Sequence, residues 1–444
     1  MKTGRREFIK KSTLAGAGLT IGGMGMSAAS YSRIAGANDR VVFAAVGVNS
    51  RGLDNIRAVL GCTGVAFSHI CDVDSRAINK GMEEVEKMTG SKPSGEEDIR
   101  RIIENKSIDA ITVATPDHWH APMAIMAARA GKHVYLEKPS SHNIRENEIL
   151  VDVYRQTGKV IQMGNQQRSA PTSIEAVERI KKGDIGRPYF GKAWYDNTRG
   201  PIGRGKIATV PGWLNWDLWQ GPAPRTAYRD NIVHYNWHWF WRWGTGELLN
   251  NATHEVDVCR WALGVDYPDK VSAMGGRFHF MDDDWEFYDT QVVNYQYGDD
   301  KLITWEGKSC NGMKEYNMGR GALIQGTEGS VILHRNGYEM YDLAGKLVEK
   351  KEETGKSETT GTRGSGSLDV LHMYNFLEGI RSGSRLNAPV DDGAVSVNLC
   401  HMGNISQKVG RMIEIDTLTG RVVKDDEAIA LMQRDYEPGW ELSV

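Results

Sequence analysis

The sequence predicts an α/β protein of two domains, a doubly wound parallel sheet followed by an α/β domain with a large, mainly antiparallel sheet. Between residues 40 and 163, continuous apolar runs alternate with helical patterns, as strands covered on both faces require. Between residues 271 and 341, β-type runs are separated by turn signals such as Gly298–Asp300. At 444 residues the chain is long enough for two domains, which we place at residues 38–165 and 166–444.

The composition excludes two classes of partner. A net charge of -3 provides no basic face for nucleic acid, and no apolar run after the N-terminus is long enough to span a membrane, so we expect no stable membrane insertion. The cysteines lack CxxC or Cys/His metal spacing, and we expect ordinary core thiols. They are Cys62, Cys71, Cys259, Cys310 and Cys400.

The first 37 residues have the pattern of an export signal rather than of a folded segment. Arg5 and Arg6 precede Phe8-Ile9-Lys10, and a Gly/Ala-rich apolar run leads to a cleavage-site pattern before Asn38. The pattern predicts a twin-arginine signal peptide and a periplasmic protein. The alternative is a basic tail in front of a short buried helix.

A glycine-containing turn follows the first strand pattern and opens a helix pattern. It has the spacing of the dinucleotide fingerprint, except that Asn49 replaces the middle glycine, which normally lets the backbone approach a pyrophosphate. Asparagine tolerates positive φ, so we expect the turn to survive. The residues predicted to bind a dinucleotide here are Gly47, Asn49, Ser50, Arg51 and Gly52.

An acidic residue ends the second strand pattern, Val65–Cys71, twenty residues beyond Gly52. A carboxylate in this place accepts hydrogen bonds from the adenosine ribose hydroxyls and repels a 2′-phosphate. Asp72 therefore favours NAD over NADP. The alternative is that Asp72 caps the next helix or lies on the surface.

Three more strand patterns end in polar segments. Carboxyl ends of parallel strands share one edge of the sheet, where open α/β sheets bind their ligands. The strand patterns are Ile108–Ala114, followed by Thr115 and Pro116; His133–Leu136, followed by Glu137 and Lys138; and residues 158–163, followed by Asn165, Gln166 and Arg168.

Asp117, His118 and His120 crowd the loop after the first of these strands. Three ligands on so short a loop rarely converge on a metal ion and no fourth is evident, so we predict no metal site. His120 is better interpreted as a hydrogen-bonding partner of cofactor or substrate.

Aromatic residues are concentrated between Trp213 and Trp243, a stretch with seven tryptophans. Rings with polar edges stack on sugar faces, while neighbouring polar side chains bind hydroxyl groups. We expect the cluster to form a carbohydrate-facing wall, although any single tryptophan can equally fill a core. Its polar members Tyr235, His238 and Arg242 are candidate substrate-binding residues, with His234 interleaved.

The segment Gly244–Asp257 places Asn250 and His254 four residues apart, on one face of a helix. Together with Gly47–Gly52, Thr115-Pro116 and Glu137-Lys138-Pro139, this segment resembles the Gfo/Idh/MocA family of nicotinamide-dependent sugar oxidoreductases. The resemblance covers essentially all of residues 40 to 440. One departure is clear, because Asn250 stands where sugar dehydrogenases of that family have an aspartate.

The resemblance implies a Rossmann-like cofactor domain and a second domain whose open sheet face mediates formation of a homodimer or homotetramer. It implies that Thr115 and Pro116 approach the nicotinamide ribose, and that Asn165, Gln166 and Arg168 touch cofactor or substrate. Lys138, His254 and the residue at position 250 form the catalytic group. In this interpretation His254 accepts the hydroxyl proton and Lys138 stabilises the developing alkoxide, with His238 and Tyr235 as the next candidates.

The expected function is NAD-dependent oxidation of a sugar or glycoside hydroxyl group. Because the periplasm supplies no free NAD, we expect tightly held cofactor that is regenerated in place. Regeneration can use a second substrate, or a redox-neutral glycosidase cycle of oxidation, elimination, hydration and reduction; the sequence does not separate the two. A non-catalytic carbohydrate-binding protein is a third interpretation, favoured by Asn49 and Asn250 and opposed by Lys138 and His254.

Overall fold

A parallel six-stranded sheet forms the first part of the computed structural model, which describes residues 40–353 and 367–443. The predicted signal segment lies outside the described residues. The strand order β3-β2-β1-β4-β5-β6 reverses direction between β1 and β4. The strands are β1 (Val41–Val46), β2 (Val65–Cys71), β3 (Ser94–Glu96), β4 (Ala110–Val113), β5 (His133–Leu136) and β6 (Ile161–Met163).

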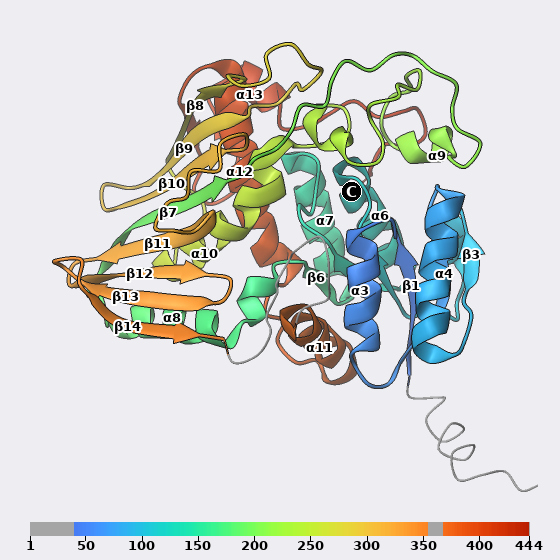
Figure 1. Cartoon of the computed structure of the whole chain (residues 1–444), viewed down its shortest axis with the longest axis horizontal. Helices are drawn as coiled ribbons and strands as arrows, with labels where there is room; N and C mark the ends of the chain where they lie inside the picture. Colours follow the sequence, from blue (N-terminus) through green and yellow to red (C-terminus); the bar gives the residue numbers. More distant parts are fainter. Residues whose placement is uncertain (1–39, 354–366, 444) are drawn as a thin grey trace, which may run out of the picture. The chain divides into compact units, whose positions relative to one another are not determined.

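Helices cover both faces of this sheet, which is why its central strands β1 and β4 are largely apolar (Figure 1). One apolar core contains Ile111 and Leu136, and the core on the other face contains Phe43 and Tyr135. Phe376 of α11, near the end of the chain, belongs to the second core, so a helix distant in sequence completes this domain. The helices are α3 (Arg51–Leu60), α4 (Ser75–Thr89), α5 (Ile99–Glu104), α6 (Asp117–Arg129), α7 (Ile144–Thr157) and α11 (Ser367–Ser382).

The second sheet has ten strands in the order β14-β13-β12-β11-β7-β10-β9-β8-β15-β16. Every neighbouring pair is antiparallel except β7 and β10, which confirms the mainly antiparallel sheet. The strands are β7 (Pro188–Asp196), β8 (Lys270–Gly276), β9 (Thr290–Tyr297), β10 (Lys301–Lys308), β11 (Arg320–Gly326), β12 (Gly329–His334), β13 (Gly337–Asp342), β14 (Leu347–Glu352), β15 (Ile413–Ile415) and β16 (Val422–Val423).

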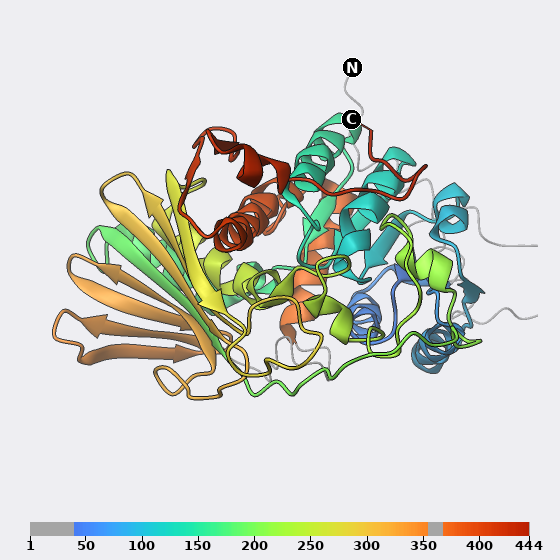
Figure 2. The same cartoon turned by 90° about the horizontal axis from the view of Figure 1, so that it is seen from above.

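Helices pack on one face of the second sheet and leave the other face open (Figure 2). Burial alternates along β9 and β10, as expected for strands with one covered face. The packed helices are α8 (Pro171–Lys182), α10 (Thr253–Leu263) and α12 (Val390–Val409). The short elements are α9 (Trp216–Gln220), α13 (Asp426–Ala430), the 3₁₀ helices η1 (Gln166–Ser169) and η2 (Asn236–Trp239), and the π-helix η3 (Leu248–Ala252).

Proline is most common in the first turn of a helix, but α6 begins before the turn that contains Pro122. It starts at Asp117, so Pro122 lies inside the helix and cannot donate to the carbonyl of His118. Nη2 of Arg434 donates to that carbonyl instead, at 2.7 Å. The replacement donor comes from the far end of the chain, so a local pattern could not have indicated it. No helix in the described part of the chain has the length and apolar character to cross a membrane.

Candidate functional site

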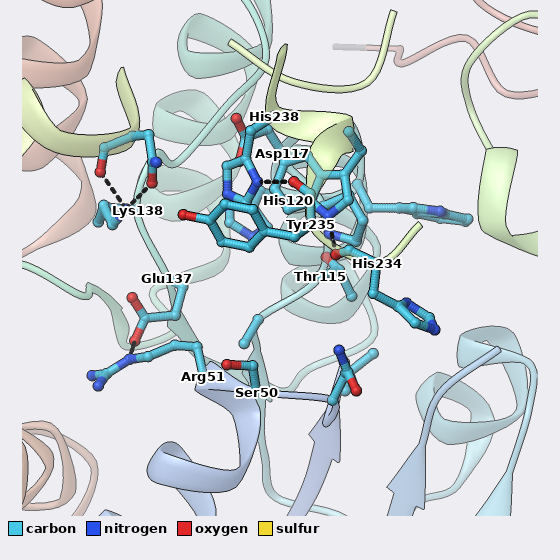
Figure 3. A pocket seen from close by; sticks show the side chains of 18 of the residues that line it. Ser50, Arg51, Thr115, Asp117, His120, Glu137, Lys138, His234, Tyr235 and His238 are labelled. Carbon is cyan, nitrogen blue, oxygen red and sulfur yellow. Dashed lines mark hydrogen bonds and ion pairs between the residues drawn. The ribbon is translucent and has the colours of Figure 1, made fainter. Parts of the chain in front are cut away.

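A cavity of about 830 Å³ lies at the carboxyl edge of the parallel sheet. One side is lined by residues that follow β1, β2, β4 and β5, around the point where the strand order reverses. The other side is lined by the connection between β7 and η3, whose Tyr235 and His238 appear in Figure 3. Residues of η3 and α10 complete this side, together with Arg320 and Arg335. Its size is typical of a small-molecule or cofactor site.

Two glycines shape the turn between β1 and α3. Gly47 has a φ of +76°, and a Cβ there would lie 2.7 Å from the carbonyl oxygen of Ala114. A Cβ on Gly52 would lie 1.8 Å from the carbonyl oxygen of Gly47. Asn49 does not adopt a positive φ, although we expected that asparagine would tolerate one at this position. Asn49 and Ser50 line the cavity at the start of α3, where free backbone N–H groups favour a phosphate.

Asp72 is held at the end of β2 with its carboxylate on the cavity. Its Oδ2 accepts from the backbone N–H of Val48 at 2.7 Å, and its Oδ1 accepts from that of Asp74 at 3.0 Å. The alternative role for Asp72 was to cap the next helix. That role belongs to Asp74, whose side chain accepts from the N–H of Arg76 at the start of α4. Asp72 is therefore placed where the ribose hydroxyls of a dinucleotide lie in this fold.

Arg51 lines the cavity, but its guanidinium is already occupied. Nε lies 2.8 Å from Oε1 of Glu137, and Nη2 lies 2.7 Å from Oδ1 of Asp369, both carboxylates being buried. These ion pairs tie the turn to the end of β5 and to α11. A phosphate contact from this guanidinium, as we expected, would have to compete with both pairs.

The three polar residues after β4, Asp117, His118 and His120, make different contacts. His118 points between main-chain carbonyls, with Nδ1 3.2 Å from the oxygen of Trp243 and Nε2 2.9 Å from that of Trp219. Nδ1 of His120 lies 2.6 Å from the carbonyl of Pro139, which can only accept, so Nδ1 carries the proton. Nε2 of His120 is then a buried acceptor without a protein partner on the wall of the cavity. Burial lowers the pKa of His120, which keeps the ring neutral.

Asp117 is a buried member of the cavity wall that we considered only as a metal ligand. Its Oδ2 accepts from the hydroxyl of Thr245 at 2.5 Å. Burial raises the pKa of Asp117 to about 7, against the opposing effects of Thr245 and Lys138. The sequence could have indicated Asp117 as a cavity residue, because it follows the carboxyl end of β4. That position is the reason for which we selected Thr115 and Pro116, which also line the cavity.

Lys138 meets Asn250 across the cavity. Its Nζ donates to the backbone carbonyl of Asn250 at 2.6 Å and to the side-chain Oδ1 at 3.2 Å (Figure 3). Asn250 lies in the π-helix η3, an irregularity that is frequent at functional sites. Burial lowers the pKa of Lys138 to about 8, although Glu137 and Asp117 oppose this. Lys138 can therefore act as a cation that gives up its proton readily.

His254, in the first turn of α10, also lines the cavity, with 7% of its surface exposed. Burial lowers its pKa well below the ordinary value, and the positive charge of Lys138 adds to this. The neutral imidazole can accept a proton or a hydrogen bond. Lys138, Asn250 and His254 line the same cavity, but the direct contact of Asn250 is with Lys138.

Charged and phenolic side chains form a wall that the sequence did not indicate. Arg199 pairs with Glu247 (Nε to Oε2, 2.5 Å) and donates to the hydroxyl of Tyr235 at 2.7 Å. Arg320, on β11, pairs with Glu255 and donates to Asn251. They stand in different segments with no recognisable motif. The wall residues that line the cavity include Tyr195, Arg199, Asn251 and Arg320, together with the predicted Gln166, Tyr235 and His238.

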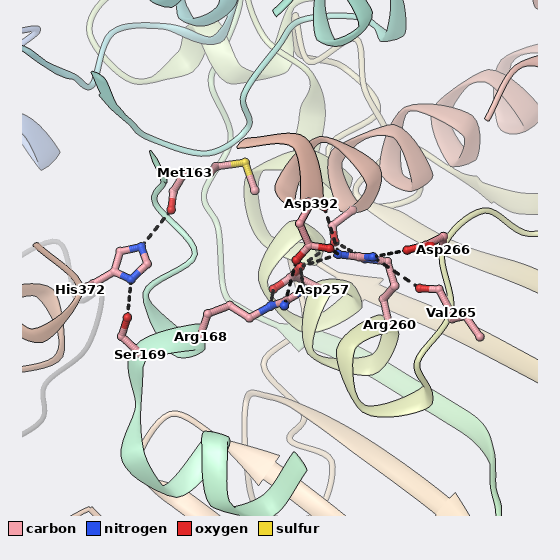
Figure 4. A network of polar contacts seen from close by, with 10 residues as sticks. Met163, Arg168, Ser169, Asp257, Arg260, Val265, Asp266, His372 and Asp392 are labelled. Carbon is pink, nitrogen blue, oxygen red and sulfur yellow. Dashed lines mark hydrogen bonds and ion pairs between the residues drawn. The ribbon is translucent and has the colours of Figure 1, made fainter. Parts of the chain in front are cut away.

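Four of the residues predicted to bind cofactor or substrate, Gly52, Asn165, Arg168 and Arg242, do not line the cavity, which corrects our expectation of direct contact. Arg168 is bidentate on Asp257 and lies 3.0 Å from Asp392, in a buried network behind the site (Figure 4). Asn165 is buried outside the lining. Arg242 is directed to the carbonyl of Pro224. Carboxylates and carbonyls from distant segments determine these orientations.

The tryptophan cluster is mainly a core rather than a carbohydrate-facing wall. Of its seven members only Trp219 and Trp237 line the main cavity. Trp216 and Trp243 pack with them in one apolar cluster, and Trp239 stacks on Trp285 in another. The expectation for the cluster as a whole was therefore wrong for most of its rings, because they pack against each other.

The strand order, the glycine turn and the ribose-facing carboxylate define an NAD-binding Rossmann domain joined to a second domain. The features fit the cofactor: a turn closed to any Cβ, a helix start for the pyrophosphate and Asp72 for the ribose. Lys138 lies in the cavity where β5 ends, and in this fold it would stand beside the nicotinamide. The class defined is an oxidoreductase that transfers hydride between NAD and a ligand in the second half of the cavity.

Comparison with known families places the chain in this class. Residues 41–165 match the model of the oxidoreductase family with an NAD-binding Rossmann fold, and residues 174–332 match the C-terminal domain model of the same family. The chain belongs to the Gfo/Idh/MocA family.

Some curated relatives align along most of the chain and others along about half of it or less. It is 28% identical to an alpha-N-acetylgalactosaminidase of Tannerella forsythia, over 86% of this chain and 89% of that protein. It is 31% identical to a glycosyl hydrolase family 109 protein of Saccharopolyspora erythraea, but over only 51% of this chain and 55% of that protein.

Solved structures share the fold. The WlbA dehydrogenase of Bordetella pertussis, in complex with NADH and UDP-GlcNAcA, has a TM-score of 0.61 at 20% identity, over 85% of this chain and 99% of that one. An oxidoreductase domain protein of Kribbella flavida has a TM-score of 0.65 at 18% identity, over 85% and 99%.

Proposed function

We propose that this oxidoreductase acts on a hydroxyl group of a glycoside and uses the oxidation to cleave the glycosidic bond, so that the cycle is redox-neutral. The observation that carries the proposal is the approach of Lys138 to Asn250, beside His254 and at the nicotinamide end of the cavity. The relatives named as glycosyl hydrolases support it, because hydrolysis by an NAD-binding oxidoreductase requires the hydride to be returned.

The residues of the cavity account for the proton movements. When bound, the nicotinamide supplies the acceptor of the hydride. Neutral His254 takes the hydroxyl proton, and cationic Lys138 stabilises the negative charge that develops on the oxygen. Asn250 fixes the direction of the Lys138 ammonium group but cannot take up a proton itself.

Bond cleavage follows from the ketone. A proton is lost from the carbon next to the carbonyl group, the glycosidic C–O bond breaks with departure of the alcohol, and water adds to the resulting double bond. The nicotinamide, held beside Lys138, would supply the hydride that restores the hydroxyl group. The neutral acceptors His120 and His238 line the same cavity and are available to this second proton transfer.

Net oxidation of a free sugar or glycoside is the second candidate, and the same residues serve it. Membership of a family of oxidoreductases favours this candidate. In either case we propose that the protein is exported to the periplasm with its cofactor bound and that it assembles as a homodimer or homotetramer through the open face of the second sheet.

The test is to incubate the NAD-loaded protein with aryl glycosides, including an α-N-acetylgalactosaminide, in deuterium oxide. The redox-neutral cycle predicts release of the phenol without net NADH, and deuterium on the carbon that lost its proton. Phenol release with no deuterium on the sugar ring would contradict the cycle. Stoichiometric NADH and a stable ketone would instead support net oxidation.

A further inference from the structure

Residues 210–239, hereafter the strap, connect β7 to the catalytic segment and pair with the residues after β2. The N–H of Ser75 donates to the carbonyl of Trp213 at 3.0 Å, and the N–H of Asn215 donates to the carbonyl of Val73 at 2.9 Å. Asp74 and Leu214 form an isolated antiparallel bridge between these two bonds. The strap, which contains α9, is thus fastened to the cofactor domain beside α4 (Figure 1).

Side chains strengthen the same attachment. Nε2 of His234 lies 2.7 Å from Oδ2 of Asp74, a carboxylate that is 1% exposed. The guanidinium of Arg76, itself paired with Asp74, lies 3.4 Å from the centre of the Trp213 ring, within the range of a cation–π contact. Asp74 therefore takes part in both side-chain attachments, because it contacts His234 directly and pairs with the Arg76 that lies on Trp213. It also caps α4.

The attachment lies at the adenosine end of the cofactor site. Asp72, the predicted ribose partner, is two residues before Asp74, and it lines the cavity together with Val73 and Ile99. His234 and Trp237, on the strap, line the same cavity. At α9 the strap is also held by α6, where Nε1 of Trp119 donates to the carbonyl of Trp219 at 3.0 Å.

We propose that the strap completes the NAD site and retains the cofactor: the contacts of Trp213 and His234 with residues 73–76 close the adenosine half, so NAD leaves only after the strap detaches. The proposal depends on NAD binding and is independent of the substrate. It also supplies a physical basis for a protein that keeps one cofactor molecule through many turnovers.

The experiment measures exchange of the bound cofactor in the full chain. Protein loaded with NAD is freed of excess ligand by gel filtration and mixed with an excess of isotopically labelled NAD, and mass spectrometry follows the bound fraction over time. We expect H234A and W213A to exchange at least tenfold faster than wild type.

Asp74→Asn sharpens the test, because asparagine keeps the oxygen that caps α4 but removes the charge facing His234. We expect faster exchange in D74N and no further acceleration in the double variant D74N/H234A, since both remove the same contact. Additive acceleration would overturn the role of that contact.

H279A is the matched control, as His279 is exposed and lies outside the cavity lining. It should exchange like wild type. Wild-type exchange rates in both H234A and W213A would overturn the proposal, and so would variants that change only the KM for a glycoside. If W213A does not fold, as judged by its thermal unfolding, the D74N and H234A variants decide the matter.

Discussion

The two halves of the cavity are assembled in different ways. The cofactor half is lined mainly by residues between 46 and 138, most of which follow strands of one parallel sheet, and the strap adds His234 and Trp237. The substrate half is lined by side chains from distant segments, such as Arg199, Asn250 and Arg320, and ion pairs with Glu247 and Glu255 hold the two arginines in place. Topology alone brings the first set together, whereas the second depends on tertiary packing. The substrate half can therefore change without disturbing the binding of NAD.

Lys138 is the residue that belongs to both halves, because it follows β5 and contacts Asn250 of η3. We expect Lys138→Met to leave the fold and the bound NAD unchanged and to slow hydride transfer by roughly a hundredfold or more, the usual cost of a lost charge-stabilising group. Single-turnover formation of NADH measures the step directly.

The control for this change is Lys346→Met, at an exposed lysine outside the cavity lining. K346M should react like wild type. Near-normal single-turnover rates in K138M would show that the charge developing on the substrate oxygen is stabilised elsewhere, and the two halves would then lack this connection.

Asp72→Ala tests the cofactor half alone. The loss of a charge-assisted hydrogen bond to the ribose costs about 1.5–3 kcal/mol, equivalent to roughly a tenfold to hundredfold weaker binding of NAD. Affinity should fall while the KM for the glycoside at saturating NAD stays the same. Calorimetric titration of NAD into stripped protein measures the first quantity, and equal affinities would remove Asp72 from the ribose site.

The sequence could predict the cofactor half because its signals are local. A glycine at a fixed turn position, an acid at the end of a strand and polar residues at strand exits are each visible within a few residues, and β2 and β5 were bounded correctly. The wall built by Arg199 and Arg320 has no such signal. The orientations of Arg168 and Arg242 were wrong because distant acceptors determine them.

Tyr235→Phe tests the substrate half by removing a single oxygen atom. It removes the hydroxyl that accepts from Nη1 of Arg199 but keeps the ring, and Glu247 still pairs with the guanidinium. A lost hydrogen bond to a charged group costs about 1.5–3 kcal/mol when buried, and less here because Tyr235 is 46% exposed. We therefore expect a few-fold higher KM for the glycoside with unchanged exchange of NAD. A changed affinity for NAD alone would mean that Tyr235 belongs to the cofactor half.

The smallest expected effect is a change of pH dependence in Asn250→Asp, which restores the acid that sugar dehydrogenases of the family have at this place. From the sequence alone we would expect the acid to act on His254, by raising its pKa and moving the acidic limb of activity to higher pH. The structure shows that the side chain of Asn250 contacts Lys138 instead, at 3.2 Å. A new carboxylate there favours the ammonium form and raises the pKa of Lys138 by roughly one unit or more.

The sign of the change follows from the role of Lys138 as a cation. Because its pKa is lowered to about 8, wild-type activity should fall as the pH rises through about 8 and the ammonium loses its proton. In N250D this basic limb should move to higher pH, with the rate below pH 7 changed only a few-fold. A pH profile of single-turnover hydride transfer measures both limbs. If only the acidic limb moves, the residue at position 250 acts through His254; if neither moves, Asn250 only orients Lys138 and its charge is immaterial.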